Sequence, residues 1–444
     1  MQKMLYERTK IVILIITTGI IFFLYYLLTR TSVVSGVNEY TDNLRKSTLN
    51  DIYRESVLEG SIIDSSGNII SEATEKSKTG SLVYPEAYSW LIGYNDVTYG
   101  AYGLKGRYEE YLYMPGEDGK GATIQLTIND NLQRKAYELI SGSEASVIVL
   151  NTTSGEILTL ASSKKDTQFN ANEINEYMEE WNKIDGFFLP NGYKDMEEPG
   201  SVFKIITASS IVENNMENNI IQDSGTLDIQ GHTVRNSGES AFGSVSLQDA
   251  LGYSSNVYFA QEALLLGESE LNEKGKDFLI GEDIELDFTT LKSNWNLANA
   301  SLALLADTAY GQGKTLITPL QIAMIGQAVA NDGKMLKPYL VDDISLNGNI
   351  LYEGEKTCLT QSISEETSSL LQEYLNKVAE NNYGINLYNI SAKTGTAELP
   401  NGYVKKYFLA FNQDYVVLIS QKDISGYGID LKDKVMELFG LLYQ

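Results

Sequence analysis

The stretch EEPGSVFKIITAS (residues 197–209) places Ser201 directly after a Pro-Gly pair and Lys204 three residues later. Proline and glycine before the serine favour a sharp turn into a helix, and the apolar residues that follow can continue that helix. The first N–H groups of a helix have no partner inside it, and that end carries partial positive charge. Ser201 can therefore serve as a nucleophile whose own N–H stabilises a developing oxyanion.

Lys204 is expected on the same helix face as Ser201, because residues three apart face the same side. Its neighbours in VFKIITAS are apolar, so burial should lower the pKa of its ammonium group. A neutral amine beside a serine can take the hydroxyl proton, as histidine does in other serine enzymes. A second Ser-x-x-Lys, Ser162 and Lys165, lies in the polar turn SSKKD, where the lysine would stay hydrated and charged. Ser201 is therefore the predicted nucleophile.

Two later motifs supply groups that complete such a site. Ser254 and Asn256 form a Ser-x-Asn set in YSSN (residues 253–256), at a turn between helical stretches, and Lys393 begins Lys-Thr-Gly at the end of a predicted strand. Other copies of the motifs exist: Ser66-Gly67-Asn68, Ser345-Leu346-Asn347 and Lys78-Thr79-Gly80. Only the set that starts at Ser201 has the order Ser-x-x-Lys, Ser-x-Asn, Lys-Thr-Gly with each motif in a suitable element.

This ordered triple resembles the penicillin-recognising serine enzymes. The resemblance extends to the hairpin TSGEILTLAS (153–162), to YSSNVYFA (253–260) and to GQGKTLITPLQIAMIGQAVANDGKMLKP (311–338). It covers residues 122–420 well and the preceding hundred only loosely. Together with an apolar N-terminal segment, the chain looks like a class B (monofunctional) penicillin-binding protein.

The resemblance implies a peptidoglycan D,D-transpeptidase that is acylated by β-lactam antibiotics. Ser201 would attack the carbonyl between the two terminal D-alanines of a stem peptide, and an amine from a second strand would then resolve the acyl-enzyme. Lys204 would be the base. Ser254 would relay a proton to the leaving amine, and Asn256 would contact Lys204 and the substrate amide.

The third motif is implied to bind the substrate. Lys393 would help to keep Lys204 neutral and would steer the terminal carboxylate. Thr394 and Thr396 would hydrogen-bond that carboxylate. Gly395 would let the substrate backbone lie against the strand, and the Thr396 N–H would be the second oxyanion donor.

The expected fold class is α+β, with a central antiparallel sheet flanked by helices. Strands are predicted in the hairpin at residues 146–162 and in ISAKTGTAE, KKYFLAFNQD and YVVLISQKD near the end of the chain, and a helix with Asn129 or Asp130 at its cap follows ATIQLTI. Residues 30–121 are polar, with short alternating runs such as GSIIDSSGNII, and predict a smaller β-rich pedestal domain before a penicillin-binding transpeptidase domain at 122–444. In the pedestal, Glu59 and Ser65 stand where the family pattern Arg-Gly-x-Ile-x-Asp-Arg has arginines.

Residues 11–29, IVILIITTGIIFFLYYLLT, are uncharged and about as long as a bilayer core is thick. Lys3, Arg8 and Lys10 lie in the preceding tail, residues 1–10, and favour a cytoplasmic N-terminus. The segment is therefore predicted to be a single-pass membrane anchor with the catalytic part outside, and the resemblance implies that the membrane is a bacterial cell membrane. A cleaved signal peptide is the alternative, although the apolar run is longer than such signals usually are.

Composition excludes several other classes of function. With 34 basic and 59 acidic residues the net charge is -25, so the surface would repel nucleic acid. The chain has a single cysteine, Cys358, and a single histidine, His232. They leave little scope for a Cys-His dyad, and they cannot form a disulfide framework or a multi-histidine metal site. No cofactor or metal is therefore expected. Gly313-Lys314-Thr315 ends like a phosphate loop, but Thr308 stands where its first glycine is required.

Three alternatives share the motifs. A β-lactamase would hydrolyse the acyl-enzyme, a D,D-carboxypeptidase would pass the acyl group to water, and a non-catalytic sensor or scaffold would use the site for binding alone. The expected partners are peptidoglycan stem peptides, β-lactams, the membrane through the N-terminal helix, and a glycosyltransferase of the wall-synthesis machinery.

Overall fold

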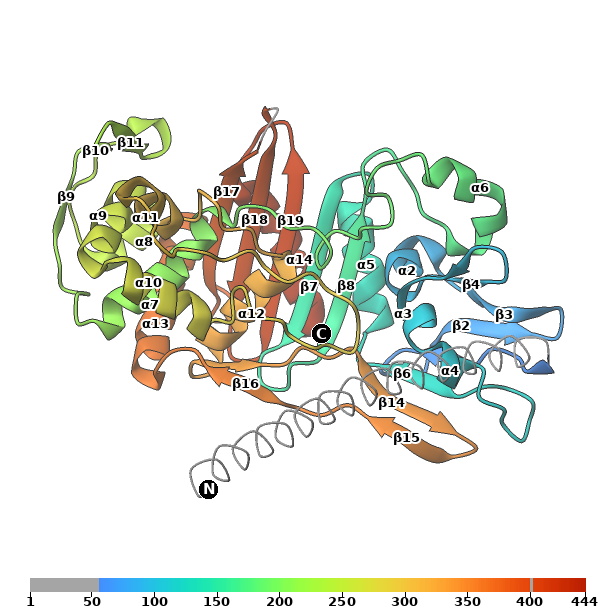
Figure 1. Ribbon diagram of the computed structural model, residues 1–444. Coiled ribbons are helices and arrows are strands. Elements are labelled where there is room, and N and C mark those ends of the chain that lie inside the picture. Colours follow the sequence, from blue (N-terminus) through green and yellow to red (C-terminus); the bar gives the residue numbers. More distant parts are fainter. Residues whose placement is uncertain (1–55, 400–401) are drawn as a thin grey trace, which may run out of the picture.

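A computed structural model describes residues 56–399 and 402–444 of the chain. Two sheets organise these residues, and a group of helices lies beside the edge strand β17 of one of them (Figure 1). The fold is mixed α+β, with a β-rich N-terminal region, as the sequence predicts. The predicted tail (1–10) and anchor (11–29) lie outside the described residues. Within the described ranges, no helix is long and apolar enough to cross a membrane.

The first sheet has five strands, all antiparallel, in the order β17-β18-β19-β7-β8. Its interior strand β7 is buried at every position from 145 to 150, so both faces of the sheet are covered. The predicted hairpin is confirmed as β7–β8. The strands are β7 (Glu144–Asn151), β8 (Ile157–Ser163), β17 (Ser391–Glu398), β18 (Val404–Phe411) and β19 (Tyr415–Asp423).

Helices cover this sheet on both sides. On one face α12 packs against β7, β18 and β19, and Gly326 of this helix lies against Leu409 and Phe411. On the other face α5 and α14 pack together against β7, β8 and β19. Asn129 caps α5 by accepting the N–H of Leu132, which confirms one of the two predicted caps. The helices are α5 (Asp130–Ile140), α12 (Pro319–Ala330) and α14 (Lys432–Leu442).

The helical group that faces β17 carries two of the three motifs. α13 packs along β17 and also against α7, α8 and α12. Three short strand pairs adjoin the group, and an irregular segment links α10 to α11. The helices of this group are α7 (Lys204–Glu213), α8 (Leu247–Tyr253), α9 (Asn256–Leu266), α10 (Glu268–Asp277), α11 (Leu302–Ala309) and α13 (Glu365–Tyr383). The adjoining strands are β9 (Ile221–Asp223), β10 (Thr226–Ile229), β11 (His232–Arg235), β12 (Gly243–Val245), β13 (Lys334–Leu336) and β16 (Cys358–Gln361).

The second sheet has six strands in the order β15-β14-β6-β1-β2-β3. β6, β14 and β15 follow the predicted domain boundary at residues 121/122, whereas β1, β2 and β3 precede it. Strands from both predicted domains therefore share this sheet, and the division into two domains stays a prediction. This region contains β1 (Ile62–Ile63), β2 (Ile69–Thr74), β3 (Ser77–Leu82), α2 (Pro85–Ile92), β4 (Asn95–Asp96), β5 (Gly100–Ala101), α3 (Gly103–Arg107), α4 (Glu109–Leu112), β6 (Thr123–Leu126), α6 (Ile174–Trp181), β14 (Val341–Leu346) and β15 (Asn349–Glu353).

The strand predicted in ISAKTGTAE is confirmed as β17, but the prediction that Lys393 ends a strand is wrong. Lys393 is the third residue of β17, which continues through Thr394-Gly395-Thr396 to Glu398. The strand does not stop at the glycine because β18 pairs with it in unbroken register, from Ser391 opposite Phe411 to Glu398 opposite Val404. All four residues of the Lys-Thr-Gly-Thr motif therefore lie within the paired strand and not in a turn.

Glu59, the acidic residue at a family arginine position, is fully buried in the six-stranded region. Its Oε1 lies 3.1 Å from Lys105 Nζ, and its Oε2 accepts the N–H of Gly80 at 2.9 Å. Lys105 Nζ also donates to the Gly80 carbonyl. Glu59 and Lys105 therefore form a buried ion pair that ties α3 to β3.

Removing one partner of this ion pair should destabilise the protein strongly. Glu59→Ala leaves Lys105 charged in the interior, and we expect the free energy of unfolding to fall by about 3–5 kcal/mol. The partly exposed pair of Glu72 and Lys120, 2.8 Å apart, is the matched control, and Glu72→Ala should cost less than about 1 kcal/mol. Urea unfolding measures both variants. Equal losses would contradict the structural role given to Glu59.

Candidate active site

Ser201 lies in a short 3-10 turn, Gly200–Phe203, that leads directly into α7. Gly200 has a φ of +56°, and a Cβ atom there would lie 2.8 Å from the Thr396 carbonyl oxygen. Its N–H donates to the Gly311 carbonyl at 2.9 Å. Glycine is thus required because the turn approaches two other backbones. This close approach places the nucleophile beside β17.

The amine of Lys204 lies at the centre of the predicted motifs. Its Nζ is 3.0 Å from Ser201 Oγ, 2.7 Å from Asn256 Oδ1, 2.6 Å from the Ser254 carbonyl oxygen and 3.1 Å from Ser254 Oγ. The lysine side chain is fully buried, whereas Ser201, Ser254 and Asn256 are only half-buried. The amine is therefore enclosed beneath two hydroxyl groups that solvent can reach.

Ser254 owes its position to an unusual backbone conformation. It ends α8 with φ 56° and ψ 42°, in the left-handed region that residues other than glycine seldom adopt. This conformation reverses the chain between α8 and α9 and turns both the carbonyl and the hydroxyl of Ser254 towards Lys204. Strain of about 1 kcal/mol or more at a functional position is typical of active sites.

Lys393 approaches the same hydroxyl from the sheet. Its Nζ lies 3.0 Å from Ser254 Oγ, and its side chain is almost completely buried. Two lysine amines therefore flank one serine hydroxyl. Within the described residues, both amines hydrogen-bond to neutral oxygens, and no carboxylate forms an ion pair with either of them.

Burial without a counter-charge lowers the pKa of both lysines. The pKa of Lys204 falls well below its usual value, first because of burial and second because of the positive charge of Lys393. Burial lowers the pKa of Lys393 to about 7. Both shifts favour the neutral amine, and for Lys204 this is the direction that the sequence predicts.

The remaining residues of the third motif lie along the edge strand. The Thr394 Oγ1 atom is 3.0 Å from the hydroxyl oxygen of Tyr383, and Thr396 Oγ1 accepts the N–H of Gly428 at 3.2 Å. A Cβ atom on Gly395 would lie 3.0 Å from the Pro199 carbonyl oxygen, so this glycine allows β17 to pack against the turn that carries Ser201. All eight predicted site residues therefore belong to one region of the fold.

A buried polar network that the sequence analysis missed supports Asn256. Asn236 Oδ1 accepts the N–H groups of Asn256 and Val257, at 2.8 and 3.1 Å, and its amide nitrogen donates to both carboxylate oxygens of Asp223 at 2.8 Å. Ser255, the N-cap of α9, donates to Asp223 Oδ2 at 2.5 Å. These residues fix the start of α9, but no motif or periodicity in the sequence marks them.

The alternative residues considered from the sequence have other partners. Ser162 is buried in β8 and accepts the N–H of Asn191 at 2.8 Å. His232 Nε2 lies 2.9 Å from Asp307 Oδ1, and Cys358 is exposed on β16. In the part of the chain that the structure describes, no group of three or more His, Cys, Asp or Glu side chains could hold a metal ion.

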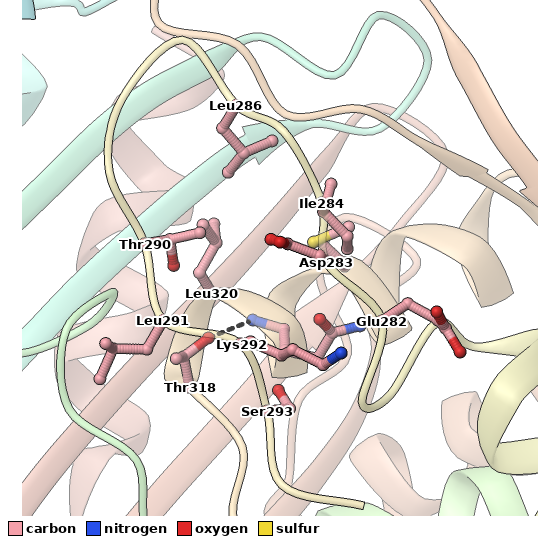
Figure 2. A pocket seen from close by; sticks show the side chains of 12 residues that line it. Glu282, Asp283, Ile284, Leu286, Thr290, Leu291, Lys292, Ser293, Thr318 and Leu320 are labelled. Atoms are coloured by element: carbon pink, nitrogen blue, oxygen red, sulfur yellow. Dashed lines mark hydrogen bonds between the residues drawn. The ribbon is translucent and has the colours of Figure 1, made fainter. Parts of the chain in front are cut away.

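A separate pocket lies between residues 282–293 and the start of α12 (Figure 2). Leu286, Leu291 and Leu320 contribute apolar surface, and Thr318 Oγ1 accepts the N–H of Gln321 beside it. None of the predicted catalytic residues lines this pocket, so it does not form part of the candidate site.

Known proteins share both the sequence and the fold. A family model described as penicillin binding protein transpeptidase domain matches residues 145–436. Penicillin-binding protein 3 of Bacillus subtilis is 25% identical over 352 residues, which are 69% of this chain and 49% of that protein. The chain thus spans about half the length of this relative. Peptidoglycan D,D-transpeptidase PbpA of Mycobacterium tuberculosis is 26% identical over 357 residues, 71% of each protein.

Two solved structures have closely similar folds. The D,D-transpeptidase domain of a peptidoglycan glycosyltransferase from Eggerthella lenta superposes with a TM-score of 0.80 at 25% identity, covering 87% of this chain and 99% of that domain. Penicillin-binding protein A of M. tuberculosis, solved as its penicillin G acyl-enzyme complex, has a TM-score of 0.80 at 20% identity and covers 88% of this chain and 100% of its own. Because the family model covers more than half of the sequence, the chain belongs to the penicillin-binding protein transpeptidase family, and its relatives are class B penicillin-binding proteins.

Proposed function

We propose that the chain is a serine D,D-transpeptidase that cross-links peptidoglycan stem peptides and is acylated by β-lactams at Ser201. The observation that carries the proposal is the set of oxygens around Lys204 Nζ. A neutral amine has two N–H groups and one lone pair. The Ser254 carbonyl and Asn256 Oδ1 can only accept, so they take the two N–H groups at 2.6 and 2.7 Å. The lone pair is left for the hydroxyl proton of Ser201, 3.0 Å away.

Acylation follows from this arrangement. The Ser201 proton passes to Lys204, and Oγ attacks the carbonyl carbon of the penultimate D-alanine. The N–H groups of Ser201 and Thr396 stabilise the oxyanion. As the C–N bond breaks, Ser254 passes its proton to the leaving nitrogen and receives one from Lys204, 3.1 Å away. Free D-alanine leaves, and an ester to Ser201 remains.

The second half-reaction reverses the proton path. An amine of another stem peptide attacks the ester carbonyl and gives up a proton through Ser254 to Lys204. The bond to Oγ breaks, Ser201 recovers its proton from Lys204, and the new amide is the cross-link. In a β-lactam the cleaved C–N bond lies in the ring, so the leaving nitrogen stays attached and blocks the approach of the acceptor amine. This explains a long-lived adduct.

The same proposal includes the setting of the reaction. Residues 11–29 anchor the chain in a bacterial membrane with residues 30–444 outside, and a glycosyltransferase that makes glycan strands supplies the substrate. The apolar run and the basic residues before it support this placement.

Covalent labelling tests the nucleophile. Incubation with penicillin G should add the mass of one drug molecule to the intact protein, and Ser201→Ala should abolish the gain. Ser162→Ala, which removes the serine of the second Ser-x-x-Lys, is the control and should label normally. Intact-mass spectrometry reads the result. No gain in the unaltered chain, or a gain that survives Ser201→Ala, would reject the assignment, and loss of the adduct within seconds would identify a β-lactamase.

The pH dependence of acylation tests the two lysines separately. Lys393 is protonated below a pKa of about 7 and loses its charge above it. The second-order rate constant for penicillin G, which carries a carboxylate, should therefore fall by about tenfold from pH 6 to pH 9. Penicillin G methyl ester lacks that negative charge and should show no such fall. If Lys204 had an ordinary pKa, the rate for both compounds would instead rise up to pH 10.

Replacing Lys393 should stabilise the protein while impairing acylation. Because its pKa is lowered in the folded state, the unfolded chain binds more protons, and stability rises with pH between about 7 and the usual lysine value. Lys393→Met removes this cost, and we expect a gain of roughly 1–3 kcal/mol at pH 7 that shrinks at pH 10. Urea unfolding measures it. Lys405→Met, which breaks a buried ion pair with Asp195, is the control and should destabilise.

A further inference from the structure

Tyr383 contacts the substrate-binding strand from outside the three motifs. It is the last residue of α13, and its ring packs on Phe408 with the ring centroids 5.4 Å apart. Its hydroxyl oxygen lies 3.0 Å from Thr394 Oγ1 and accepts the N–H of Thr394 at 3.2 Å. Phe408 is the residue opposite Thr394 in the register of β17 with β18, so ring and hydroxyl engage the same position of the sheet.

The N–H that Tyr383 binds belongs to the open edge of the sheet. In an antiparallel pair, alternate residues direct their N–H groups towards the partner strand and away from it. β17 is an edge strand, and the Thr394 N–H points away from β18 because it is bonded to Tyr383. The N–H of Thr396, two residues further, therefore points the same way. The hydroxyl of Tyr383 therefore binds the outward-pointing N–H of Thr394, which comes just before the proposed oxyanion donor, the N–H of Thr396.

The same contact sets the direction of the threonine hydroxyl. A tyrosine oxygen has one proton to donate and lone pairs that accept. Because it accepts the Thr394 N–H, its own proton is available for Thr394 Oγ1. The proton of Thr394 is then free to point at a ligand. Burial raises the pKa of Tyr383, so its hydroxyl stays protonated throughout the physiological range.

We propose that Tyr383 is a positioning residue for carboxylate recognition. It holds Thr394 Oγ1 as a hydrogen-bond donor to the terminal carboxylate of the donor peptide or β-lactam. This inference rests on the proposed function, because it concerns the ligand of the same site.

The test compares Tyr383→Phe with the unaltered full chain. Phenylalanine keeps the packing on Phe408 and loses both hydrogen bonds. The second-order rate constant for acylation by penicillin G should fall about threefold to tenfold, whereas that for penicillin G methyl ester should change less than about twofold. The ratio of the two constants is the readout, since a general loss of structure would lower both alike.

Two further variants make the test specific. Tyr374→Phe removes a hydroxyl from the same helix, where the charged neighbours are Glu373, Lys377 and Glu217, and should leave the ratio unchanged. In a Thr394→Val background, Tyr383→Phe should have no additional effect on the ratio, because the tyrosine acts through the threonine hydroxyl.

The outcomes separate the two proposals. Absence of acylation in the unaltered chain would overturn the proposed function. Normal acylation with an unchanged ratio in Tyr383→Phe, or an effect that persists in Thr394→Val, would overturn the role of Tyr383 alone.

Discussion

The structure of the site depends on burying two lysine amines on either side of one serine hydroxyl. Lys204 and Lys393 both lie within 3.1 Å of Ser254 Oγ, and neither has a carboxylate among its recorded partners in the described residues. Burying an ammonium group without a counter-charge is unfavourable, and the group responds by giving up its proton. Desolvation and like-charge repulsion thus both lower the pKa of Lys204, with no histidine involved. Only a rigid surrounding structure can hold such a pair together.

That rigidity comes from backbone contacts that admit no side chain. Gly200 packs against the backbones of Thr396 and Gly311, and a Cβ atom on Gly311 would lie only 1.9 Å from the Gly200 carbonyl oxygen. Gly395 lies against Pro199 in the same way. The turn with Ser201, the segment before α12 and the strand with Lys393 are thereby held at backbone distance, so the spacing between Ser201 and Lys393 does not depend on flexible side chains alone.

The sequence predicted the residues that gather around Lys204 better than the residues that hold them in place. Ser201, Lys204, Ser254, Asn256 and Lys393 lie in ordered motifs, and the structure brings them together. The motifs can be recognised in the sequence because each places its functional residues within three or four consecutive positions.

The supporting residues have no such signature. Asp223 and Asn236 lie 33 and 20 positions before Asn256 in the sequence, and Tyr383 contacts Thr394 from the end of α13. The strand end expected at Lys393 was wrong because glycine and threonine suggest a turn locally, whereas pairing with β18 and packing against Pro199 and Val202 decide the conformation. Tertiary contacts overrode local propensity there.

The segment KDMEEPGS (residues 194–201), which leads to Ser201, contains three acidic residues. Asp195 forms an ion pair of 2.7 Å with Lys405, which is almost completely buried on β18, and Glu197 lies 3.4 Å from Lys422 on β19. The hydroxyl of Tyr407, on β18, donates to the Glu198 carbonyl at 3.2 Å. These contacts attach the approach to Ser201 to the sheet immediately before Gly200 meets β17. Asp195 and Glu197 are therefore paired with lysines on β18 and β19, which leaves Lys204 and Lys393 without the counter-charge that would raise their pKa values.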